Sequence, residues 1–118
     1  MTTQQPTLIE QLVIDARKAQ ASINKYSQEQ VDELILAVAW EVIQPKNNQE
    51  LSEMAVEQTG LGDIEDKKRK NRRKTVGLLR DLKDVKSVGI IKDNTKKGIT
   101  EIARPIGVIG AVVPSTNP

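Results

Sequence analysis

The chain contains no cysteine, no histidine and no phenylalanine, and it has only one tryptophan and one tyrosine. Without cysteine it cannot form a disulfide bond, and it has no thiol that could act as a nucleophile. Without histidine it lacks the commonest general base and metal ligand. We therefore predict no catalytic residue and no metal-binding residue within these 118 residues.

The chain also lacks a strong net charge and a long apolar run. There are 18 lysines and arginines against 16 aspartates and glutamates, and the net charge of +2 neither favours nor excludes a polyanionic partner. No apolar run approaches the roughly 20 residues of a membrane span. The first six residues, MTTQQP, lack the basic and apolar regions of a signal peptide. The sequence thus predicts no membrane association and a cytoplasmic location.

Apolar residues at helical spacing predict two helices in the first part of the chain. The first covers residues 6–24, with Pro6 at its first position. The second begins at Ser27, which forms a capping box with Gln30, and it ends before Pro45. Its inner face is predicted to consist of Val31, Leu34, Ile35, Val38 and Val42.

Two further helices are predicted downstream. The third runs from about Gln49, with Asn48 as its cap, and ends at Gly60 or Gly62 in the left-handed conformation that glycine adopts most easily. Asp63 is the predicted cap of the fourth helix, whose second half is apolar. That half contains Val76, Leu78, Leu79 and Leu82.

Strand patterns replace helical ones after these helices. Residues 87–91 and 99–103 are predicted to form a hairpin whose polar turn is 92–98. Residues 106–113, IGVIGAVV, form a nearly unbroken apolar run, which is typical of a strand buried on both faces of an α/β sheet. Such a strand needs neighbouring strands and covering helices, so the sequence predicts an α/β fold that is incomplete as given.

The most conspicuous charged feature is the run KKRKNRRK at residues 67–74, which has seven basic residues in eight. It can indicate a nucleic-acid surface. However, no aromatic residue is interleaved for base stacking, and Asp66 and Asp81 flank the run. On a helix the charges would also point in several directions. We therefore interpret it as a solvated helix face and predict no nucleic-acid partner.

The end of the chain offers two candidate binding features. Gly107 and Gly110 lie inside the predicted strand and do not form the G-x-G-x-x-G fingerprint of a dinucleotide site. The following PSTNP turn lies where ligands bind in open α/β sheets, beyond the carboxyl end of a strand. Its hydroxyl and amide groups could bind a cofactor or an oxyanion, but an ordinary loop between two prolines is equally compatible.

Three segments resemble the aldehyde dehydrogenase superfamily. The segment EIARPIGVIGAVVPSTNP is similar to the strand and loop that enter its Rossmann-like cofactor domain, and the PSTNP form resembles the CoA-acylating branch. The segments KAQASINKYSQEQVDELILAVAW and LSEMAVEQTGLGDIEDKKRKN are similar to the helices of that branch. Together they cover about residues 10–118. The loop hints at the sulfoacetaldehyde or related semialdehyde subgroup.

The resemblance implies a fold and a domain organisation. Residues 1–118 would be the N-terminal portion of the cofactor-binding domain, with four helices, a hairpin arm at about 85–104 of the kind that joins subunits, and the first buried strand. The catalytic domain and its cysteine would be absent. We therefore expect the isolated chain to be inactive.

The resemblance also assigns cofactor-binding residues, namely Pro114, Ser115, Thr116 and Asn117. In acid-forming members the loop asparagine helps to form the oxyanion hole. By strict register Thr116 takes that position here and Asn117 falls one residue later, so the oxyanion role is open between them. Ser115 departs mildly from the threonine of many acylating members.

For the complete enzyme the resemblance implies covalent catalysis. A cysteine thiolate attacks the aldehyde, hydride passes to NAD or NADP, and CoA takes the resulting thioester. The expected partners are a small aldehyde, CoA and further copies of the enzyme. Two alternatives stay open: a stand-alone helical binding module that uses the basic run, and an acid-forming dehydrogenase, which usually carries tryptophan in the terminal loop.

Overall fold

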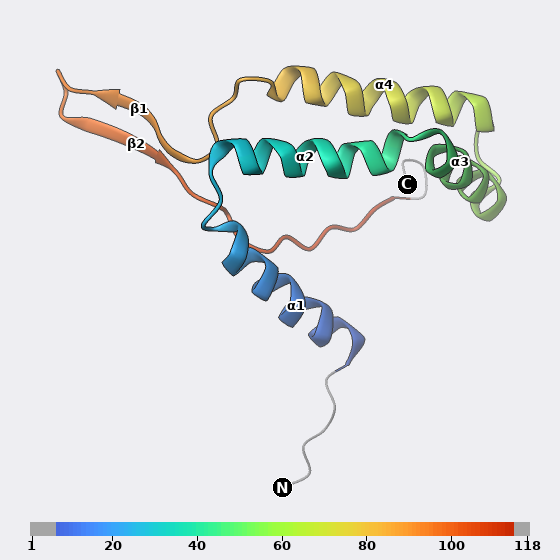
Figure 1. The fold of residues 1–118 in the computed structure, drawn as a ribbon. Coiled ribbons are helices and arrows are strands. Elements are labelled where there is room, and N and C mark those ends of the chain that lie inside the picture. Colours follow the sequence, from blue (N-terminus) through green and yellow to red (C-terminus); the bar gives the residue numbers. More distant parts are fainter. Residues whose placement is uncertain (1–6, 115–118) are drawn as a thin grey trace, which may run out of the picture. The chain divides into compact units, whose positions relative to one another are not determined.

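A computed structural model describes residues 7–114, and its helices and strands are shown in Figure 1. The described residues form two compact units, one of residues 7–31 and 86–110 and the other of residues 32–85 and 111–114. The elements are α1 (Leu8–Ile23), α2 (Gln28–Ile43), α3 (Pro45–Thr59), α4 (Ile64–Leu82), β1 (Gly89–Asn94) and β2 (Ile99–Ala103). Among these helices, none is both long and apolar enough to cross a membrane.

In the first unit, α1 begins at Leu8 because Thr7 caps it. The Thr7 side chain accepts a hydrogen bond from the Glu10 backbone at 3.3 Å, and the Glu10 carboxylate accepts one from the Thr7 backbone at 2.7 Å. The predicted start at Pro6 is therefore wrong, and Pro6 itself lies outside the described residues. The backbone hydrogen bond from Thr7 lowers the pKa of Glu10, so this cap weakens as falling pH protonates the carboxylate.

The predicted capping box at the start of α2 is confirmed. The Gln30 backbone donates to the Ser27 hydroxyl at 3.3 Å, and the Ser27 backbone donates to the Gln30 side chain at 2.9 Å. Because this signal involves two residues three positions apart, it can be read from the sequence without knowing what packs on the helix.

The first unit also contains the hairpin of β1 and β2, which pair antiparallel with a bulge between Ile90 and Lys92. A Lys92–Glu101 ion pair at 3.4 Å crosses the ladder. The first strand lies later than the predicted 87–91. Ser87 and Val88 stay out of the ladder because their backbone N–H groups donate to the Gln28 side-chain oxygen at 2.8 and 3.0 Å.

Replacing Gln28 with alanine should loosen the root of this hairpin. The change removes both backbone contacts and the 3.1 Å bond from the Gln28 amide to the Ser87 hydroxyl. We expect the local opening free energy at Val88 to fall by about 1–3 kcal/mol, because its half-buried N–H loses its acceptor. Hydrogen exchange of the Ser87 and Val88 amides measures this loss.

The matched control is Gln11→Ala, which removes a side-chain amide that donates to exposed Asp15 on α1. It should leave exchange at the hairpin root unchanged. Equal exchange of Val88 in the wild-type and Gln28→Ala chains would contradict the anchoring role of Gln28.

In the second unit, α3 begins four residues earlier than predicted. Pro45 occupies the first turn of α3 instead of only ending α2, and Gln44 is the residue before the helix. Proline suits this position because its missing N–H would have no helical partner there. The predicted end at Gly60 is confirmed, with φ of 64° in the left-handed region.

Asn48 was predicted to cap α3, and this prediction is wrong. The residue lies inside the helix and is part of a polar contact between α3 and α4. Its side-chain amide donates to the Lys68 carbonyl at 3.0 Å and accepts from the Asn71 amide at 3.1 Å. Ser52 beside it has no exposed surface, and Ala55 is buried one turn further. We call Asn48, Ser52, Ala55 and Asn71 the α3–α4 seam.

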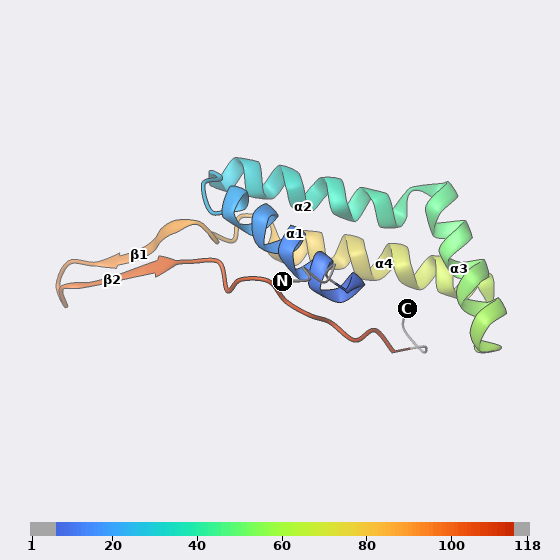
Figure 2. The same cartoon turned by 90° about the horizontal axis from the view of Figure 1, so that it is seen from below.

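Within the second unit, α2 and α4 run side by side in opposite directions (Figures 1 and 2). The predicted inner face of α2 is only partly covered: Leu34 is 38% exposed and Val38 is 60% exposed, whereas Ala39 is buried. Within this unit Leu34 and Val38 are thus not covered, contrary to the prediction.

The predicted strand at residues 106–113 is also wrong for the described chain. These residues have no regular structure, and Ile106 and Val112 are 89% and 100% exposed. A strand needs a partner for its backbone N–H and C=O groups. The one sheet among the described residues contains only β1 and β2, so this segment has no partner there.

Candidate functional site

The predicted cofactor loop lies almost wholly outside the described residues. Pro114 is described, and it is exposed in irregular backbone. Ser115, Thr116 and Asn117 lie outside the described residues. Their role in cofactor binding stays a prediction.

The basic run lies on α4, whose N-terminus is capped as predicted: the Asp66 backbone donates to the Asp63 carboxylate at 3.0 Å. The run is not uniformly solvated, however, because Lys67 is only 8% exposed. A side chain on Gly62 would place its Cβ 3.3 Å from the Lys67 Cε atom. Lys67 therefore packs its aliphatic stem against the turn between α3 and α4, and Asn71 packs in the α3–α4 seam.

The outward side of α4 is a mixed-charge surface. Arg69 forms an ion pair with Asp66 at 2.8 Å, and Lys68 forms one with Glu65 at 2.9 Å. A shallow hollow of about 230 Å³ is lined by Asp66, Arg69, Lys70 and Arg73. Acidic groups thus lie among the basic side chains of this surface.

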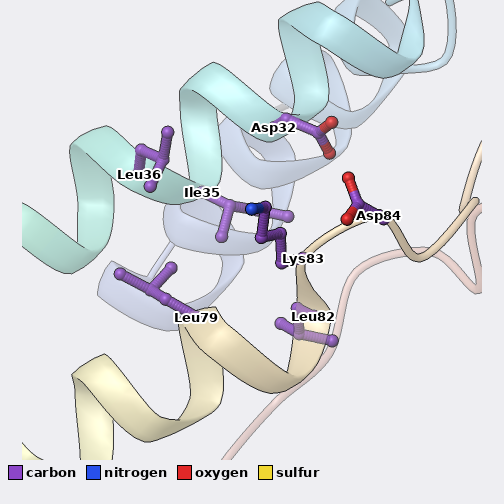
Figure 3. A pocket seen from close by; sticks show the side chains of 7 residues that line it. All are labelled: Asp32, Ile35, Leu36, Leu79, Leu82, Lys83 and Asp84. Atoms are coloured by element: carbon purple, nitrogen blue, oxygen red, sulfur yellow. The ribbon is translucent and has the colours of Figure 1, made fainter.

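A groove that was not predicted from the sequence lies between α2 and α4 (Figure 3). Ile35 and Leu36 come from α2, and Leu79 and Leu82 come from the end of α4. The groove measures about 240 Å³ and is also lined by Asp32, Lys83 and Asp84. We call these seven residues the α2–α4 groove. Its walls are apolar. Its charged residues come from the first part of α2 and from the two positions that follow α4.

The groove was missed because the sequence identified the second half of α4 only as apolar and did not place Leu79 and Leu82 next to α2. Leu36 is 57% exposed and Leu82 is 41% exposed. One available signal was the composition of α2, which has apolar residues on all sides and no basic residue. A helix of that kind is typical of a protein interior.

Neither surface forms a recognisable catalytic site. The described residues contain no cluster of three or more carboxylates that could hold a metal ion. The groove supplies two carboxylates and one ammonium group but no nucleophile with an adjacent base. Its geometry suits packing against another apolar surface.

No protein-family model matches the chain. Curated proteins do match it. The sulfoacetaldehyde dehydrogenase (acylating) of Bilophila wadsworthia is 49% identical over 112 residues, which are 95% of this chain and 24% of that protein. The enzyme of the same name from Cupriavidus necator is 50% identical over 107 residues, 91% of this chain and 22% of that protein. The succinate-semialdehyde dehydrogenase (acetylating) of Clostridium kluyveri is 39% identical over 93% of this chain and 24% of that protein.

The chain is similar to the N-terminal region of the acylating aldehyde dehydrogenases. The predicted resemblance to this branch is thereby confirmed, as is its α/β class. The chain spans about a quarter of the length of the curated relatives it matches. The four helices and the hairpin thus correspond to the N-terminal part of an acylating aldehyde dehydrogenase.

Proposed function

We propose that this chain forms the N-terminal region of an enzyme that converts an aldehyde to acyl-CoA with NAD or NADP and CoA. The observation that carries the proposal is 49–50% identity to two acylating dehydrogenases over more than nine tenths of the chain. The chain itself has no cysteine. The thiol nucleophile of the proposed reaction must therefore come from outside these 118 residues, and the isolated chain should not catalyse the reaction.

The proposed substrate is sulfoacetaldehyde or a closely related short aldehyde with an anionic group. Two relatives named for sulfoacetaldehyde are 49% and 50% identical to the chain, against 39% for one named for succinate semialdehyde. The PSTNP loop supports the same subgroup. In this proposal Pro114, Ser115, Thr116 and Asn117 line the cofactor site.

The proposed assembly is a homo-oligomer joined through the hairpin. Ile90, Ile99 and Ile102 on the two strands are 59%, 54% and 54% exposed. Apolar side chains in that number on one short hairpin are typical of a surface that is covered by a partner. The ladder itself leaves an unpaired strand edge on each side, which favours the same interpretation.

A chimera tests the proposed activity. The chain is joined to the part of the B. wadsworthia enzyme that follows its matched region, and the reduction of NAD or NADP is followed with sulfoacetaldehyde and CoA. We expect CoA-dependent turnover by the chimera, and none by the isolated chain or by the downstream part alone.

The chimera must first be shown to be folded by circular dichroism and light scattering. A folded chimera that forms no acyl-CoA from sulfoacetaldehyde, acetaldehyde or succinate semialdehyde would contradict the proposed function. Turnover without CoA, giving a free acid, would instead support the acid-forming alternative.

A further inference from the structure

Helix α2 has apolar side chains around its whole circumference. Leu36 and Trp40 are 57% and 55% exposed on one side, and Leu34 and Val38 are 38% and 60% exposed on another. Side chains one helical turn apart share a face, so each of these pairs forms a small apolar patch. A helix that is apolar all round is normally buried inside a protein.

The Leu36 side of α2 continues into a hollow. Leu36 lines the α2–α4 groove together with Ile35, and Leu79 and Leu82 form the opposite wall (Figure 3). The groove is therefore an apolar surface built by two helices of one compact unit, and each of its walls is formed by leucine or isoleucine.

The outward side of α4 is different in character. It carries Arg69, Lys70 and Arg73, and its Arg69–Asp66 ion pair has both side chains more than 70% exposed. A single helix thus has one side suited to water and another that forms an apolar wall. The exposed apolar side chains of this unit therefore lie on particular helix faces and are not spread evenly over its surface.

We propose that the α2–α4 groove and the adjoining Trp40 are covered by the polypeptide that follows this region in the acylating dehydrogenases. The proposal rests on the proposed function. The chain matches only 22–24% of its relatives, so more than three quarters of such an enzyme lies outside this structure. The leucine and isoleucine walls of the groove fit an apolar element of that downstream part.

Residue-level footprinting tests the proposal on the isolated chain and on the chimera described above. Carbene labelling followed by mass spectrometry reports the accessibility of individual side chains. We expect labelling of Leu36, Trp40 and Leu82 to fall several-fold in the chimera. Arg69 and Arg73 should be labelled equally in both proteins, and they serve as internal controls.

A substitution gives an independent readout. Leu36→Glu should leave the helix content of the isolated chain unchanged, because that side chain is already more than half exposed. In the chimera it should lower the thermal midpoint and the yield of folded protein, because a carboxylate would be buried without a partner. Arg73→Glu, which introduces the same side chain on the outward side of α4, should do neither.

Each outcome separates this proposal from the proposed function. Unchanged labelling of Leu36, Trp40 and Leu82 in an active chimera would overturn the groove assignment and leave the proposed function standing. Protection in an inactive chimera would support the groove assignment and contradict the proposed function. Protection that grows with the concentration of the isolated chain would identify a second copy as the occupant and overturn the proposal.

Discussion

Replacing Asn117 with alanine in the chimeric dehydrogenase should reduce kcat by roughly 100- to 1000-fold. The proposed reaction develops negative charge on the aldehyde oxygen, and the terminal loop is the predicted source of a hydrogen-bond donor for it. A side-chain amide always offers N–H donors, whereas the hydroxyl of Thr116 can act as a donor or as an acceptor. We therefore expect a smaller loss of kcat for Thr116→Val. Steady-state kinetics with saturating aldehyde and CoA measures both values.

The strict register of the loop makes the opposite prediction. If Thr116→Val lost most of kcat and Asn117→Ala lost little, Thr116 would be the oxyanion donor. Arg73→Ala is the control, because its side chain lies on the outward side of α4 and should leave kcat unchanged. If KM for the cofactor rose while kcat was retained in both loop variants, the loop would bind the cofactor without contacting the reacting oxygen.

The second large effect concerns the α3–α4 seam. Replacing Ser52 with leucine should lower the free energy of unfolding of the chain by about 1–3 kcal/mol. Ser52 has no exposed surface, and its hydroxyl lies 3.4 Å from the Asn71 amide that it accepts from. A leucine there would need space between two packed helices and would remove one acceptor from Asn71.

Urea denaturation followed by circular dichroism measures this change. The control is Glu53→Leu, which introduces the same side chain at the next position of α3, where the residue is exposed. We expect its unfolding midpoint to stay close to that of the wild-type chain. A Ser52→Leu chain with an unchanged midpoint would show that the seam does not contribute to stability.

Most features that depend on neighbours in sequence were predicted well, although the capping box of Thr7 and Glu10 was missed. Ser27 with Gln30, Gly60 and Asp63 all cap helices as predicted, because each cap is made within three or four residues. Proline was ambiguous because it both ends one helix and suits the first turn of the next. Pro45 does the latter, and that moved the start of α3 and placed Asn48 inside the helix.

Features that depend on distant packing were predicted poorly. Residues 106–113 have the composition of a buried strand, but a strand forms only where another strand supplies its hydrogen bonds. Lys67 lies in a basic run and is buried, because its stem fits the turn at Gly62, which the run itself does not reveal. The polar groups of the PSTNP turn made it a candidate site, and the family resemblance assigned cofactor binding to residues 114–117.

The anchoring of the hairpin root by Gln28 has a consequence for the order of events during translation. Gln28 can bind Ser87 only after the ribosome has added Ser87, which lies 59 positions later in the chain. The Asn48–Asn71 bond of the seam joins residues only 23 positions apart. At ribosomal elongation rates, the residue that Gln28 binds is added about 3–12 seconds after Gln28 itself. On the nascent chain, Asn71 is therefore added before Ser87, so both partners of the seam leave the ribosome before the partner of Gln28 does.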